Sequence, residues 1–152
     1  MIQWEICKRD FEFDGAGLDI YVFGTTIEDW GSLFNVLRTS YCFEYSVDGE
    51  PGQFPKTIEE VFLIRKSASP ALSFLVGKIS VVCHFFHETD IEFDIDPREV
   101  TSQAELDILL NFLRQVGATI HRSVVLTPEN GPEQSIITYD SELEKFQYHA
   151  AH

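Results

Sequence analysis

The sequence predicts an α+β fold, a two-layer arrangement in which a mostly antiparallel or mixed β-sheet carries about three helices on one face. First, segments in which apolar and polar residues alternate recur along the chain, as in half-buried strands. Second, three other segments begin with a Thr or Ser that is followed three residues later by an acid, as at capped helix starts. Third, segment 88–96 alternates carboxylates with apolar residues, which suits a sheet with one wet face.

The first elements are predicted to be strands. The apolar positions at the start of the chain are Trp4, Ile6, Phe11 and Phe13. A turn-forming segment, 14–17, separates them from a second strand-like segment at 18–24. We therefore expect the first two strands to form a β-hairpin.

Three helices are predicted from their capping residues. The first follows Thr25 and Thr26, and its apolar face comprises Ile27, Trp30, Leu33, Phe34 and Leu37. The second follows Thr57 and ends before Pro70. The third follows Ser102, and we expect Gly117 to terminate it as a C-cap glycine.

The remaining segments are predicted to be strands of the same sheet. Segment 41–49 reads as a strand that ends in a turn, and 71–86 reads as two strands joined at Gly77 and Lys78. Residues 88–96, which we call the acidic segment, follow as a further strand. After the third helix, the chain is expected to form a strand, a Pro/Gly loop and a hairpin that turns at 140–142.

No linker or low-complexity tract divides the chain, so residues 1–152 are predicted to form a single globular domain, with 150–152 as a candidate disordered tail. The first fifteen residues carry both acids and bases, which is unlike a signal peptide. No later stretch approaches the roughly 18 apolar residues of a membrane span. The three cysteines, Cys7, Cys42 and Cys83, are widely spaced and are expected to be buried, reduced thiols. These observations together favour a cytoplasmic protein.

The chain is strongly acidic, with 25 Asp and Glu against 11 Lys and Arg and a formal net charge of −14. A surface of this sign repels phosphate, which disfavours nucleic acid and anionic membranes as partners. A basic protein is the partner that such a surface attracts. Nothing in the sequence implies a cofactor or specifies the oligomeric state.

The acidic segment places Asp90, Glu92, Asp94 and Asp96 on one side of the predicted strand and Ile91, Phe93 and Ile95 on the other. Residues two apart on a strand are separated by about 6.7 Å. Neighbouring carboxylates then repel by roughly 0.6 kcal/mol in water and about 2.5 kcal/mol at an effective dielectric constant of 20. We therefore expect this face to be exposed and to form a partner-binding surface, supported by the acids Glu12, Asp14, Glu44 and Asp48 on neighbouring strands.

The acidic segment does not match a metal or catalytic site. Calcium loops need Gly at the sixth position and Glu at the twelfth, whereas registers starting at Asp90 or Glu92 place Ile95 or Pro97 at the sixth. Acid and base catalysis by two carboxylates requires different environments, which a solvated row does not offer. We therefore predict neither metal ligands nor catalytic residues here.

Segment 83–88 is the alternative site, a pocket for a small ligand or an enzymatic reaction. It contains Cys83, His84 and His87, which are candidates for a nucleophile and base or for metal ligands. On a strand, however, Cys83 and His87 are separated by roughly 13 Å, and His84 points to the opposite side. These three residues converge only if the strand is interrupted by a bulge or turn.

The sequence favours a binding protein over an enzyme. In size, acidity and lack of catalytic motifs, the chain is similar in kind to bacterial immunity proteins, which mask basic toxins. This similarity is one of class and depends on no shared motif. It implies that the chain binds a basic protein partner and has no catalytic activity. The alternatives are the pocket near Cys83 and a housekeeping domain in which acidity serves solubility.

Overall fold

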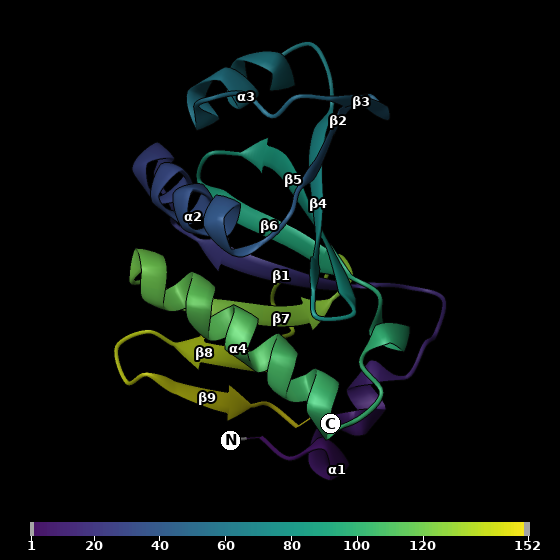
Figure 1. The fold of residues 1–152 in the computed structure, drawn as a ribbon. Coiled ribbons are helices and arrows are strands. Elements are labelled where there is room, and N and C mark those ends of the chain that lie inside the picture. The colour runs from purple at the N-terminus through teal and green to yellow at the C-terminus, as the bar shows by residue number, and fades with distance from the viewer. Residues whose placement is uncertain (1, 151–152) are drawn as a thin grey trace.

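The computed structural model describes residues 2–150 and shows an α+β fold (Figure 1). In this part of the chain, nine strands form one antiparallel sheet. The strands are β1 Leu18–Phe23, β2 Glu44–Val47, β3 Glu50–Gly52, β4 Pro70–Val76, β5 Ile79–His87, β6 Asp90–Ile95, β7 Val124–Pro128, β8 Ile137–Asp140 and β9 Lys145–Tyr148. The helices are α1 Trp4–Cys7, α2 Ile27–Ser40, α3 Ile58–Arg65 and α4 Gln103–Ile120, with the 3-10 turns η1 Lys8–Phe11 and η2 Pro97–Glu99.

The strands are arranged in the order β3-β2-β4-β5-β6-β1-β7-β8-β9. Strand β1 lies between β6 and β7, both of which come much later in the chain. The predicted strand pairs β4–β5 and β8–β9 are confirmed as adjacent antiparallel strands. The acidic segment is confirmed as a strand, β6, and it occupies a central position in the sheet between β5 and β1.

The three predicted helices are confirmed, but only two of their starts show the expected side-chain cap, because the Ser102 side chain makes no capping hydrogen bond at α4. At α2 the Thr26 side chain accepts a hydrogen bond from the Asp29 N–H at 3.2 Å, and the Asp29 carboxylate accepts one from the Thr26 N–H at 3.0 Å. At α3 the Thr57 hydroxyl accepts a hydrogen bond from the Glu60 N–H. Each of these bonds satisfies a backbone donor that the helix itself leaves without a partner.

The predicted N-terminal hairpin is wrong, because residues 4–11 form α1 and η1 instead of a strand. Trp4, Cys7 and Phe11 have the spacing of one helical face. The structure follows this helical spacing and not the strand-like alternation of neighbouring residues. Cys7 and Phe11 are buried, and the Trp4 and Phe11 rings lie 5.5 Å apart. A fourth, short α-helix is therefore present where the sequence pattern indicated a strand.

The predicted end of the third helix is also wrong. Helix α4 continues through Gly117 to Ile120, and its C-cap is His121, which adopts a left-handed conformation with φ of 54°. Gly117 serves packing instead, because a Cβ atom at this position would lie 2.6 Å from the Tyr139 ring. The missing side chain lets the helix approach strand β8 closely.

Helices α2 and α4 lie across one face of the sheet (Figure 1). Aromatic residues fill the space between them and the strands; the Trp30 ring, for example, lies 5.7 Å from Phe34 and 5.4 Å from Phe85. Cys7 and Cys83 belong to this core, and burial raises the pKa of the Cys7 thiol to about 11. The prediction of a buried thiol is wrong for Cys42, which is exposed.

Two findings complete the description of the chain. Among residues 2–150, no helix is long and apolar enough to cross a membrane. Residues 151–152 of the candidate C-terminal tail lie outside the described part of the chain.

Candidate functional site

The face of the sheet opposite Ile91, Phe93 and Ile95 is the candidate site, and we call it the open face. Those three residues are at most 3% exposed, whereas the intervening Asp90, Glu92 and Asp94 are partly exposed, so the predicted alternation along β6 is confirmed. On the three central strands the open face comprises Asp19, Tyr21 and Phe23 of β1, Asp90, Glu92 and Asp94 of β6, and Val82, His84 and Phe86 of β5.

Strand β1 places a further carboxylate beside those of β6. Asp19 is directly opposite Asp94 in the antiparallel register, at the distance where like charges repel. Asp19 is only 4% exposed, and its carboxylate accepts hydrogen bonds from the Asn130 N–H at 3.0 Å and the Tyr21 hydroxyl at 3.2 Å. Burial is the largest cause that raises the pKa of Asp19, and the charges of Asp94 and Glu129 add to it. The carboxylates therefore interact across strands as well as along β6.

His84 of β5 is the cationic counterpart within this face. Its Nε2 atom lies 2.6 Å from a carboxylate oxygen of Asp94. This hydrogen bond raises the pKa of His84, against the opposing effect of partial burial. Glu92, the neighbour of both residues, has a raised pKa because of burial and the nearby charge of Asp19. A protonated His84 thus offsets part of the negative charge of the face.

Two stacked aromatic pairs border the carboxylates of β6. On the β1 side the rings of Tyr21 and Phe23 lie 5.2 Å apart at an interplanar angle of 13°. On the β5 side the rings of His84 and Phe86 lie 5.0 Å apart at 12°. Phe23 and Phe86 remain 47% and 42% exposed. Exposed aromatic rings beside unpaired charges are typical of a surface that binds another molecule.

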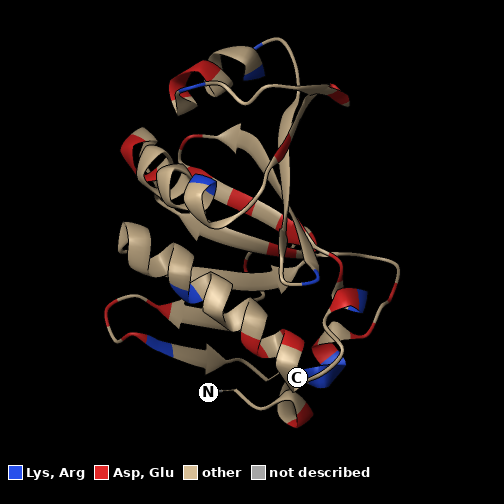
Figure 2. Cartoon of the chain, in the orientation of Figure 1, with Lys and Arg blue, Asp and Glu red and all other residues tan. Residues whose placement is uncertain are grey.

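The strands of the central region carry negative charge without Lys or Arg. Figure 2 shows acidic positions along β6, and none of the described residues of β1, β5 or β6 is a Lys or Arg. Within residues 2–150, no group of three or more His, Cys, Asp or Glu side chains is placed to hold a metal ion. The open face is thus a carboxylate row with aromatic borders.

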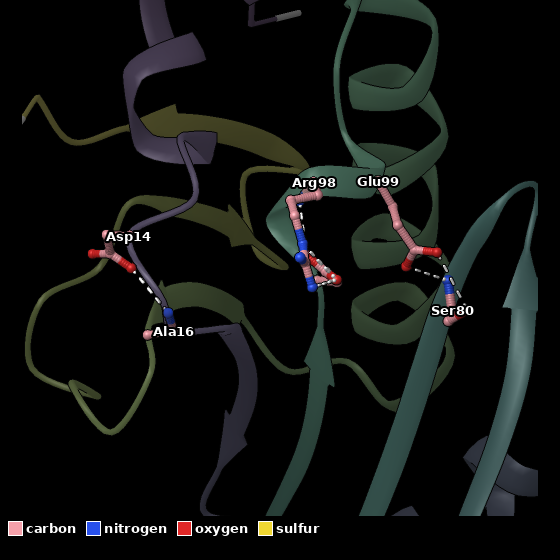
Figure 3. Close-up of polar contacts among 6 residues, drawn as sticks. Asp14, Ala16, Ser80, Arg98 and Glu99 are labelled. Carbon is pink, nitrogen blue, oxygen red and sulfur yellow. Dashed lines mark hydrogen bonds and ion pairs between the residues drawn. The ribbon is translucent and has the colours of Figure 1, made fainter.

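Asp96, the last acid of the predicted row, lies beyond the end of β6 and has a different environment. Its carboxylate accepts a hydrogen bond from the Arg98 N–H at 2.9 Å and pairs with the Arg98 guanidinium at 2.9 Å (Figure 3). Hydrogen bonding to Arg98 holds the pKa of Asp96 below its usual value. Asp96 is therefore neutralised locally, unlike Asp90 and Glu92.

The four supporting acids are largely dispersed. Glu44, on β2, is on the open face, three strands away from β6. Glu12 and Asp14 belong to no strand, and the Asp14 carboxylate accepts a hydrogen bond from the Ala16 N–H at 3.1 Å (Figure 3). Asp48 occupies the β2–β3 turn, where its carboxylate accepts a hydrogen bond from the Ser69 N–H. Of the four, only Glu44 extends the acidic face.

The residues of the alternative pocket do not converge. Cys83 is fully buried in the core, and burial raises the pKa of its thiol well above the usual value. His84 is on the open face, and His87 is exposed at the end of β5 beyond an irregularity in the β5–β6 register. His87 borders a surface hollow together with Leu63 and Phe86. The thiol and the two imidazoles thus face three different environments.

Sequence reasoning missed Asp19 and Phe23, and it did not assign Tyr21 to this face. Their period of two along segment 18–23 was a usable signal, because it equals the period of the acids on β6. Pairing of β1 with β6 was not predictable from either segment alone. Comparison of the chain with known protein families, curated proteins and solved structures found no match.

Proposed function

We propose that this protein is a binding module that docks a basic protein partner on the open face of its sheet. The observation that carries the proposal is the row of Asp90, Glu92 and Asp94 between two stacked aromatic pairs, each with one exposed Phe ring, and with no Lys or Arg on the same described strands. The proposal includes a two-layer arrangement, in which the longer helices cover one face and leave the other free. Inhibition of a basic toxin in the cytoplasm is the function that best suits such a surface.

The electrostatics of the face support this assignment. The charge of Asp94 helps to raise the pKa of Asp19, and the charge of Asp19 helps to raise the pKa of Glu92. A cation that docks against them gains attraction from several carboxylates at once, and a charged face of this kind accelerates association with a basic partner. The surrounding aromatic rings add apolar contact area, which charge alone does not provide.

A charge-neutralising triple variant tests this function. We expect D90N/E92Q/D94N to bind a basic model polypeptide, poly-lysine of defined length, at least tenfold more weakly than the unmodified protein at low salt, since several screened charge pairs of up to about 1 kcal/mol each are removed. Binding is measured by isothermal titration calorimetry at several salt concentrations, because screening must weaken this interaction.

The matched control removes three acids elsewhere. Glu28, Glu142 and Glu144 are exposed and lie outside the open face, so E28Q/E142Q/E144Q changes the net charge by the same amount. If both triple variants weaken binding equally, net charge alone explains the interaction and the open face is not a docking surface. The acidity then serves solubility.

A further inference from the structure

We propose that the docked partner anchors itself with an arginine, whose guanidinium lies against Asp90 between the rings of Phe23 and Phe86. This inference rests on the proposed function and specifies the chemistry of the partner. It specifies one position on the open face, Asp90, and it specifies arginine and not lysine as the cationic side chain that binds there.

The position follows from which carboxylates already have partners. Asp19 accepts two hydrogen bonds within the protein, and Asp94 pairs with His84. No hydrogen bond or ion pair joins the Asp90 carboxylate to another residue in 2–150. Burial raises the pKa of Glu92, which is also influenced by the Tyr21 hydroxyl and by the charge of His84. Asp90 is thus the acid of the row that an external cation can pair with at no expense to an internal contact.

The aromatic borders meet at the same position. Phe23 is directly opposite Asp90 in the β1–β6 register. On the other side of β6, His87 is opposite Asp90, and Phe86, which stacks with His84, immediately precedes it. Strands β1 and β5 both adjoin β6, so the backbones that carry these two rings are about 10 Å apart. Cation–π contacts form within about 6 Å of a ring centroid, so one cation above β6 comes within reach of both rings.

The chemistry of the position favours a guanidinium over an ammonium group. A guanidinium is planar and weakly hydrated, so it can stack on a ring while its N–H groups bond to a carboxylate, whereas an ammonium is a compact and strongly hydrated charge. The protein itself uses this pairing. All four cation–π contacts among residues 2–150 involve arginine. One of them places the Arg65 guanidinium 5.7 Å from the Phe86 ring centroid, so a docked arginine shares this ring with Arg65 and has Phe23 to itself.

Two synthetic peptides test the inference. One alternates Arg with Thr, and the other has Lys at every Arg position; when extended, each carries cations on one side at about the 6.7 Å spacing of the β6 carboxylates. We expect the Arg peptide to bind about five- to tenfold more tightly than the Lys peptide, which corresponds to the cation–π gain at a partly exposed site. Phe23→Leu and Phe86→Leu should each reduce this preference to less than about threefold.

Phe13→Leu is the control, because Phe13 is 49% exposed, stacks with Arg98 and belongs to none of the strands of the open face. It should leave the Arg preference unchanged. On the unmodified protein, nuclear magnetic resonance should show shifts of the Phe23 and Phe86 ring signals with the Arg peptide. This second measurement is independent of whether the variants fold.

The outcomes separate this inference from the proposed function. Equal affinity for the two peptides, with both lost in D90N/E92Q/D94N, overturns the arginine anchor and leaves docking on the open face intact. An Arg preference that persists in both Phe variants also overturns the anchor. If neither peptide binds the unmodified protein, docking and the anchor are both contradicted.

Discussion

Strand β6 belongs to two very different surfaces, and consecutive residues alternate between them. Phe93 is fully buried and lies against the rings of Phe74 and Phe112. Asp94, the next residue, faces away from the helices and pairs with His84. The face of β6 that carries Phe93, which we call the core face, therefore stabilises the fold through burial. The open face carries like charges that do not help the chain to fold.

This difference teaches where the protein can tolerate change. Residues of the core face are close-packed, so removal of any one of them leaves a cavity or forces a shift. On the open face, the partly buried Glu92 has a pKa raised by desolvation and by the Asp19 charge, so its charged form is held at some expense of stability. We infer that this charge is present for binding and not for the fold.

The largest expected effect is on the free energy of unfolding, and it distinguishes two neighbouring positions of β6. Phe93→Ala should lower the free energy of unfolding by about 3–5 kcal/mol, because it empties a fully buried aromatic site. Glu92→Gln should change it by no more than about 0.5 kcal/mol, and in the stabilising direction, because folding disfavours the charged form of Glu92. Denaturant unfolding of both variants measures the difference. Similar losses at both positions would break the distinction between the faces.

A smaller effect is expected where α4 meets the core face at β8. Gly117→Ala should lower the free energy of unfolding by about 1–3 kcal/mol, because the added methyl group overlaps Tyr139 and the Arg122 carbonyl oxygen. Gly31→Ala in α2 is the matched control, since nothing lies within 4 Å of a Cβ at that site. It should be stabilising, as alanine is in most helices. If the two variants have the same free energy of unfolding, Gly117 is not needed for the close approach of α4 to β8.

The smallest effect concerns His84 and Asp94 on the open face. Because folding raises the pKa of His84, the stabilisation from this pair is fully present below the unfolded pKa of about 6.5 and is lost as pH rises through the folded value. Both side chains are about one-third exposed, so the contribution should not exceed about 1 kcal/mol.

Unfolding measured across this pH range checks the expectation. Asp94→Asn should remove most of the pH-dependent stabilisation, whereas His87→Asn, at an exposed histidine outside the pair, should retain it. Glu92 and Asp19 also face His84, so some dependence on pH remains from their charges. The pair contributes nothing if Asp94→Asn unfolds with the same pH profile as the unmodified protein.

Much of the secondary structure was predictable because it depends on local chemistry. The Thr26 and Thr57 caps, the turn at Gly77 and the alternation along β6 are each encoded within a few residues. The failures occurred where a local signal had two interpretations. The apolar residues between Trp4 and Phe11 fit a strand by alternation and a helix by spacing, and Gly117 resembles a helix end although it serves close packing.

The sequence by itself determined the alternation of β6, and with it that its acids and its apolar residues occupy opposite faces, because side chains on a strand alternate with a period of two. Only the tertiary structure decided what stands beside those acids. Register with β1 brought Asp19 and Phe23 next to β6, and register with β5 brought His84 to Asp94. These contacts join segments far apart in the chain, so their geometry depends on how the strands pair and not on any short pattern within one of them.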